Sequence, residues 1–123
     1  MNIKRGEIYL AALDPVVGKE ISKTRPVIVI SNDKNNEFSA TVTILPLTSG
    51  NLQKIYPFEV FLAKGVGDLP KDSKVKADQI RTLDKRRLLT LVGKLGREET
   101  IEIEKAVKIH LGLSCSQLQN SIA

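Results

Sequence analysis

The amino-acid sequence predicts an α+β fold, in which a small antiparallel, barrel-like sheet of short strands is followed by one C-terminal α-helix. Short runs rich in β-branched residues alternate with polar connections along the first two thirds of the 123-residue chain. From residue 98 onward the apolar residues recur at a spacing of roughly 3.6 residues, which is typical of an amphipathic helix. The length fits one ordinary domain. We assign residues 1–113 to it and treat residues 114–123 as a polar, flexible tail.

The expected strands are short and follow one another in chain order. They cover residues 7–13, 26–30, 40–46, 58–62, 75–82 and 88–95. Residues 26–30, Pro-Val-Ile-Val-Ile, form a continuous β-branched run, which predicts a strand that is buried on both faces. The tight polar segment 84–87 predicts a turn between the last two strands. Asn32 and Asp33 follow the second strand and are interpreted as turn residues.

The helix is expected over residues 98–113, where Glu98 and Glu99 in the first turn favour the helix dipole. Its apolar face is predicted from the helical spacing of Ile103, Ala106, Val107, Ile109, Leu111 and Leu113. Between the first two strands, residues 14–24 form a polar stretch that is long for a hairpin. Long ordered loops are often functional, so this loop is a candidate for a role in activity.

Composition limits the kinds of partner. Nineteen Lys and Arg against fourteen Asp and Glu give a net charge of +5, and such a basic surface attracts phosphate backbones. Three Phe, two Tyr and no Trp disfavour a nucleic-acid binder built on a row of aromatic rings. The one cysteine, Cys115, suits a reducing cytosol. No signal peptide or membrane span is present in the sequence, so we expect a cytoplasmic protein.

The inventory of reactive side chains excludes several chemistries. The one histidine, His110, cannot supply a histidine acid–base pair or a histidine-rich zinc site. The sequence has neither a glycine-rich phosphate loop nor the spaced aspartates of a calcium loop. We therefore expect no cofactor and no metal.

Two residues mark a candidate anion site. Arg25 directly precedes Pro26, which biases its backbone toward an extended conformation where the buried strand begins. A guanidinium binds phosphate oxygens through two parallel hydrogen bonds. Thr48 closes the next strand and can donate its hydroxyl proton to the same kind of group. From the residues alone, an ordinary surface arginine and a threonine that stabilises a turn remain open.

The order of several short motifs resembles the MazF/PemK family of toxins. The similar stretches are residues 4–9 (KRGEIY), 14–20 (DPVVGKE), 24–33 (TRPVIVISND), 44–48 (ILPLT), 56–60 (YPFEV), 77–82 (ADQIRT) and 84–88 (DKRRL). Together they span roughly residues 3 to 113. The resemblance implies an SH3-like barrel or twisted sheet with a C-terminal helix, assembled as a homodimer. It also implies a type II toxin–antitoxin component that is blocked by a MazE-like antitoxin with an acidic, disordered segment.

The activity implied by the resemblance is metal-independent, sequence-specific cleavage of single-stranded RNA, leaving 2′,3′-cyclic phosphate and 5′-hydroxyl ends. Carried over by position, Arg25 and Thr48 would stabilise charge in the transition state. Glu20 would accept the proton of the 2′-hydroxyl group. Asn32, Asp78 and Gln79 are at family positions that face the RNA groove. Lys54 and Arg81 are candidates for contacts with backbone phosphates, and ordinary solvated surface charges stay open for both.

One departure from the family pattern lies in the long loop. Many relatives have a glycine before the Arg-Pro pair, whereas residues 20–24 read Glu-Ile-Ser-Lys-Thr, which predicts a stiffer loop. Two other functions stay open. A non-catalytic relative on the same fold would bind protein, as gyrase-inhibiting toxins do. A plain SH3-like interaction module would need an aromatic groove, which the scarcity of aromatic residues disfavours.

Overall fold

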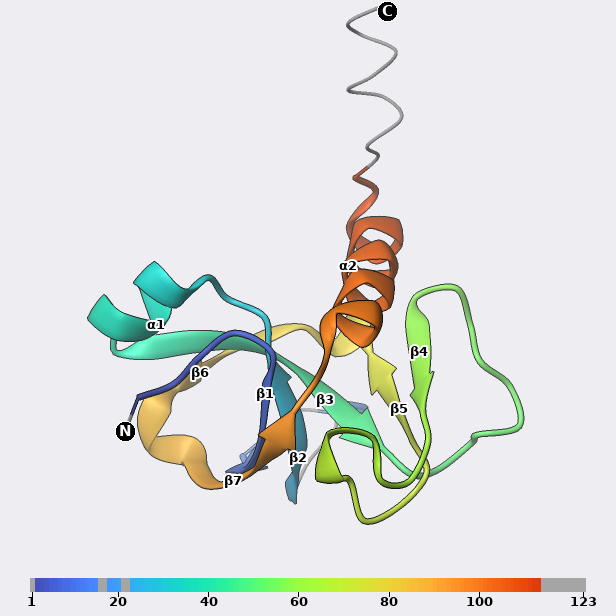
Figure 1. Cartoon of the computed structure of the whole chain (residues 1–123), viewed down its shortest axis with the longest axis horizontal. Helices are drawn as coiled ribbons and strands as arrows, with labels where there is room; N and C mark the ends of the chain where they lie inside the picture. Colours follow the sequence, from blue (N-terminus) through green and yellow to red (C-terminus); the bar gives the residue numbers. More distant parts are fainter. Residues whose placement is uncertain (1, 16–17, 21–22, 114–123) are drawn as a thin grey trace, which may run out of the picture.

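A computed structural model describes residues 2–15, 18–20 and 23–113, and shows an antiparallel sheet with a long helix packed on it (Figure 1). The strands are β1 (Glu7–Ala12), β2 (Thr24–Val29), β3 (Thr41–Thr48), β4 (Glu59–Leu62), β5 (Ser73–Lys76), β6 (Arg81–Asp84) and β7 (Leu88–Lys94). The α-helices are α1 (Asp33–Phe38) and α2 (Arg97–Leu111). Three 3-10 turns are η1 (Val66–Asp68), η2 (Ala77–Gln79) and η3 (Lys85–Arg87). The predicted α+β class is confirmed.

The sheet is organised around β3. The strand order is β4-β5-β3-β2-β1-β7, and β6 pairs with β3 beside this path. The first half of β3 pairs with β6, and its last two residues pair with β5. One edge of β3 therefore has two partner strands, one along each part of its length. Within the described residues no pairing joins β4 to β7, and the sheet is therefore twisted and open rather than a closed barrel.

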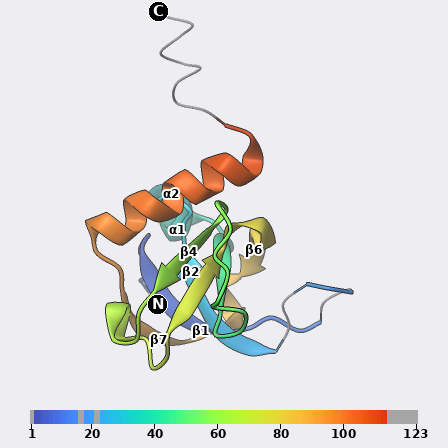
Figure 2. The same cartoon turned by 90° about the vertical axis from the view of Figure 1, so that its right-hand side faces the viewer.

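Both faces of the central strands are buried. On one side, Ile28 lies in a cluster with residues of α2 and of β3 to β5. On the other side, its neighbours Val27 and Val29 pack against Ile44 and the inner residues of β1. Helix α2 crosses the first of these faces (Figure 2). The apolar run of β2 is continuous because side chains on both faces of the strand are buried. Burial of each Val or Ile stabilises the fold by roughly 1.5–3 kcal/mol.

Helix α2 packs against the sheet as far as Val107. Ile103 and Ala106 are buried against the sheet, whereas Ile109, Leu111 and Leu113 are exposed. The predicted apolar face is therefore right at its start and wrong at its end, since the helix runs past the edge of the sheet (Figure 1). None of the helices in the described part of the chain is long and apolar enough to cross a membrane. The predicted tail, residues 114–123, lies outside the described residues.

Two local expectations were wrong. Asn32 does not simply form a turn: its side-chain oxygen accepts a hydrogen bond of 2.8 Å from Asn35 N and caps helix α1, which begins at Asp33. Turns and helix caps use the same side-chain chemistry, so the sequence pattern does not separate them. The strand expected over residues 75–82 is interrupted by η2, because Ala77–Gln79 forms a 3-10 turn between β5 and β6.

Candidate active site

The structure brings Arg25 and Thr48 to opposite positions on two neighbouring strands. In the β2–β3 ladder Val27 lies opposite Pro46. The paired residues end there, and the same antiparallel register continued by two residues would put Arg25 of β2 opposite Thr48 of β3. Both side chains are half-buried and line one hollow of about 260 Å³. The expectation that these two residues meet is thus supported by the register of the sheet.

Local sequence explains how each side chain is held. Pro26 pairs with Leu10 of β1 and fixes the backbone directly after Arg25 in an extended conformation. Thr48 ends β3, and its Oγ1 accepts a hydrogen bond of 3.1 Å from Gly50 N. That bond uses a lone pair of the hydroxyl oxygen, so the hydroxyl proton is available to donate to a ligand.

The chemistry of the hollow suits an anion. Besides Arg25 and Thr48, its wall contains Lys71, Ser49 and Ser73, and the Ser73 hydroxyl already donates a hydrogen bond of 3.0 Å to Lys71 O. Always-charged guanidinium and several O–H donors form the set that binds phosphate oxygens. Sequence reasoning missed Lys71 and Ser73, because only the pairing of β5 with β3 brings this part of the chain next to Thr48.

Glu20 is not among the residues that line this hollow. It is exposed and lies in the loop between β1 and β2. Arg81 is also elsewhere: its Nη1 donates a hydrogen bond of 3.2 Å to Leu13 O, at the point where this loop leaves β1. The structure therefore joins Arg25 with Thr48, and leaves Glu20 and Arg81 at the loop beside them.

The other predicted RNA-binding residues lie outside the Arg25 hollow. Asn32 caps α1, as described above, and lines a separate hollow with Arg5 and Thr43. Lys54 places its ammonium group 4.8 Å from the centre of the Tyr56 ring. Asp78 and Gln79 are half-buried in η2, and Oδ1 of Asp78 lies 3.8 Å from Lys76 Nζ.

A buried ionic cluster of Glu59 on β4 with Lys74 and Lys76 on β5 lies next to Thr48, and it was not predicted from the sequence. Lys74 Nζ lies 3.0 Å from Glu59 Oε1, and Lys76 Nζ lies 2.7 Å from Glu59 Oε2. Burial raises the pKa of Glu59, but hydrogen bonds from Lys76, the backbone N–H of Tyr56 and Lys74 outweigh it, so the pKa falls below its ordinary value. The alternation Lys-Val-Lys in β5 looks like an ordinary exposed strand face, and gave no signal of burial.

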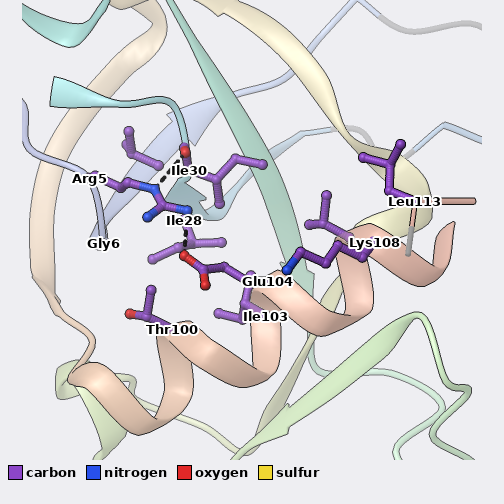
Figure 3. Close-up of a pocket in the computed structure, with 11 residues that line it drawn as sticks. Arg5, Gly6, Ile28, Ile30, Thr100, Ile103, Glu104, Lys108 and Leu113 are labelled. Atoms are coloured by element: carbon purple, nitrogen blue, oxygen red, sulfur yellow. Dashed lines mark hydrogen bonds and ion pairs between the residues drawn. The ribbon is translucent and has the colours of Figure 1, made fainter. Parts of the chain in front are cut away.

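A second hollow, of about 450 Å³, lies between α2 and β2 (Figure 3). Its wall is largely apolar and contains Ile28, Ile30 and Ile103. Arg5 bridges its mouth, because its Nη2 lies 2.9 Å from Glu104 Oε2 while its Nε donates to Ile30 O at 2.9 Å. This hollow shares no lining residue with the Arg25 hollow, and its apolar wall is less suited to a phosphate.

Metal-ligand geometry is missing from the described part of the chain. No group of three or more His, Cys, Asp or Glu side chains is placed there to hold a metal ion. The chemistry available in the Arg25 hollow consists of cations and hydroxyl donors.

Comparison with known proteins places these features in a family. Residues 4–111 match the family described as PemK-like, MazF-like toxin of type II toxin-antitoxin system. The chain is 42% identical over 112 residues to "Endoribonuclease MazF" of Staphylococcus epidermidis, an alignment that covers 91% of this chain and 93% of the relative. A crystal structure of MazF from Deinococcus radiodurans superposes with a TM-score of 0.80 at 27% identity, covering 92% of this chain and 99% of that one. An endoribonuclease in complex with its cognate antitoxin, from Mycobacterial species, gives a TM-score of 0.75 at 26% identity, covering 91% and 97%.

Proposed function

This chain belongs to the PemK-like, MazF-like toxins of type II toxin–antitoxin systems, and we propose that Arg25 and Thr48 carry its cleavage of single-stranded RNA. It is an endoribonuclease toxin, like the relatives that it matches. The single observation that supports the assignment is the position of Arg25 and Thr48 across one half-buried hollow.

The proposed reaction is a transesterification within the RNA. The 2′-hydroxyl oxygen gives up its proton and attacks the adjacent phosphorus, and the bond from phosphorus to the 5′ oxygen breaks. The 5′ oxygen takes up a proton from water and leaves as a 5′-hydroxyl group. The products are a 2′,3′-cyclic phosphate and a 5′-hydroxyl end, without a metal. Negative charge builds on the non-bridging oxygens in the transition state, and the Arg25 guanidinium and the Thr48 hydroxyl stabilise it there. Lys71 adds a second cation in the same hollow.

Proton transfer is assigned to a different kind of group. An arginine has a reference pKa of about 12.5 or more, which is a poor match for acid–base work near neutral pH. We assign acceptance of the 2′-hydroxyl proton to Glu20, in the loop that leads into β2. Contacts with the rest of the RNA are assigned to Asn32, Lys54, Asp78 and Gln79. Arg81, which the resemblance places on the same surface, is expected to act through the loop that it anchors at Leu13 O.

The proposal includes partners and location. A similar solved structure is that of an endoribonuclease in complex with its cognate antitoxin. We propose that this chain forms a homodimer, and that an antitoxin with an acidic, disordered segment competes with RNA for the basic surface. We propose that the toxin acts in the cytoplasm, where its RNA substrate is found.

The test is cleavage of a long single-stranded RNA in the presence of EDTA, with mapping of the fragment ends. Wild-type protein is expected to cut at a recurring short sequence and to leave cyclic-phosphate and 5′-hydroxyl ends. Arg25→Ala and Thr48→Ala are expected to lower the rate by at least about a hundredfold while unfolding at the wild-type temperature. Intact RNA after incubation with folded wild-type protein would refute the assignment and favour a non-catalytic, protein-binding toxin.

A further inference from the structure

Three of the few rings in this chain meet on one surface beside the ionic cluster. The chain has five aromatic residues and one histidine. Tyr56 and Phe58 are stacked, with ring centres 5.4 Å apart and planes inclined by 4°. Phe58 in turn meets His110 of α2, with ring centres 6.4 Å apart. Tyr56 remains 42% exposed, so the outermost ring of this group is open to a ligand.

One lysine lies over the exposed ring, and two more line the hollow beside it as partners of Glu59. The ammonium group of Lys54 lies 4.8 Å from the centre of the Tyr56 ring. A hollow of about 320 Å³ next to it is lined by Tyr56 together with Lys54, Lys74, Lys76, Glu59, Asn51 and Gln53. An aromatic face beside lysines and amide groups combines the three contacts that an unpaired nucleotide makes. The base stacks, the phosphate meets a cation, and the base edge meets amide groups.

The backbone under this surface is held in place. Lys74 Nζ donates to Asn51 O at 2.9 Å, to Lys54 O at 3.1 Å and to Glu59 Oε1 at 3.0 Å. Glu59 Oε1 also accepts a hydrogen bond of 3.0 Å from Tyr56 N. The segment that carries Lys54 and Tyr56 is therefore fixed by two buried side chains, and a ligand would bind without the cost of ordering it.

The surface adjoins the Arg25 hollow through the pairing of β3 with β5, although the two hollows share no lining residue. Thr48 pairs directly with Lys74, and directly paired residues of an antiparallel ladder direct their side chains to the same face of the sheet. Tyr56 follows Thr48 by eight residues, through the same loop that Lys74 holds. An RNA strand whose scissile phosphate lies at Thr48 has neighbouring nucleotides within reach of Tyr56.

We propose that Tyr56 is a stacking platform for an unpaired base that flanks the cleaved phosphodiester, and that Lys54 leaves the ring to bind the adjacent phosphate. The ligand is a nucleotide of single-stranded RNA, so this inference rests on the proposed function. It goes beyond that function by assigning a base-binding position to Tyr56, a residue that has no part in the chemistry.

Binding is tested with an engineered reporter, because the chain contains no Trp. In a non-cleaving Arg25→Ala background, Tyr56→Trp places one indole at the platform. Adding single-stranded RNA is expected to quench its fluorescence by stacking, with a salt-dependent midpoint. A matched Phe38→Trp variant, at an exposed aromatic position on α1, is expected to keep its emission. Unchanged emission of the Tyr56→Trp protein at saturating RNA, with binding shown by anisotropy of labelled RNA, would overturn the proposal.

Kinetics separate the platform from the catalytic assignment. Tyr56→Ala is expected to raise the KM for RNA by about 5- to 100-fold with little change in kcat, the range for loss of one stacked base. Tyr56→Phe keeps the ring and is expected to rescue KM to within about threefold of wild type. If wild-type protein cleaves RNA and Tyr56→Ala leaves KM unchanged, the platform is wrong and the proposed function stands. In the fluorescence experiment, quenching of the Tyr56→Trp protein by an acidic antitoxin peptide but not by RNA would also overturn the stacking proposal. Position 56 would then bind protein instead of RNA.

Discussion

The ammonium nitrogen of Lys74 and the carboxylate of Glu59 lie 3.0 Å apart, with only 3% and 1% of the two side chains exposed. Two charges are buried at little net cost only when their remaining hydrogen-bonding groups are satisfied. Here they are, because Lys74 also donates to Asn51 O and Lys54 O, and Glu59 also accepts from Lys76 and Tyr56 N. The pair therefore ties β4 and β5 to the loop that follows Thr48.

Replacing Lys74 should lower the free energy of unfolding more than replacing Lys76, the other lysine bound to Glu59. Lys74→Met leaves two backbone carbonyl groups without a donor and is expected to lower the free energy of unfolding by about 2–3 kcal/mol. Lys76→Met removes a partly exposed ammonium group and is expected to cost about 1 kcal/mol or less. Urea denaturation of the two variants measures the difference. Equal losses would contradict a structural role specific to the buried lysine.

The stability contributed by Glu59 should depend on pH in the acid range. Its pKa in the folded protein lies below the unfolded value, so the stabilisation is present above the unfolded pKa, about 4.3, and is lost as pH falls through the lower folded value. Glu59→Gln is expected to be less stable than wild type by about 2 kcal/mol at pH 7, with the gap narrowing below pH ~4. Denaturation series at several pH values test this, and a gap that is constant down to pH ~3 would contradict it.

Much of the fold was predictable, because strand burial follows directly from side-chain pattern. The continuous run of β2 predicted a strand buried on both faces, and Val27 and Ile28 lie on opposite sides in separate cores. The pairing of Arg25 with Thr48 in one site was predicted from the family resemblance. The register of β2 with β3 is consistent with it. The Lys74–Glu59 pair was not predictable, since a lysine at an alternating strand position is normally solvated. Only the loop after Thr48, folded over β5, buries it.

Gly93 should tolerate no side chain. A Cβ atom built on Gly93 would overlap the backbone of Gly67, whose carbonyl carbon would lie 2.7 Å away. Backbone cannot move aside as a flexible side chain can, so Gly93→Ala is expected to lower the free energy of unfolding by about 3 kcal/mol. Thr90→Ala, at an exposed position of the same strand, is expected to cost less than about 1 kcal/mol. Thermal unfolding followed by circular dichroism would compare them, and equal melting temperatures would exclude the close contact.

Tyr9 should ionise at unusually high pH. Burial, together with its hydrogen bond and proximity to Glu7, raises the pKa of Tyr9 to about 12. In Tyr56→Phe, Tyr9 is the only tyrosine left, so absorbance at the tyrosinate band reports it alone. The expected midpoint in the folded protein is about 12. Because the folded pKa is raised, the neutral side chain stabilises the fold below the unfolded pKa of about 10, and this stabilisation is lost as pH rises toward the folded value. A midpoint near 10 in the folded protein would contradict the buried Glu7 contact.

Arg81 and Lys54 should differ in how they affect the salt dependence of RNA binding. Both are cations assigned to the RNA surface, but the Arg81 guanidinium donates to Leu13 O at the root of the β1–β2 loop, whereas the Lys54 ammonium lies over an exposed ring. A residue that neutralises one phosphate contributes about 0.7 to the slope of log affinity against log salt concentration for a single strand. In the Arg25→Ala background, Lys54→Gln is therefore expected to reduce that slope by about 0.7.

Arg81→Gln is expected to weaken RNA binding without changing the slope, because it loosens the loop rather than removing a phosphate contact. Anisotropy of a labelled single-stranded RNA at four or five salt concentrations measures both slopes. Lys19→Gln, an exposed cation in the same loop, serves as the matched control for a change of net charge alone. A loss of slope in Arg81→Gln equal to that in Lys54→Gln would show that Arg81 leaves Leu13 O to bind phosphate when RNA is present, and would make it an RNA ligand rather than a loop anchor.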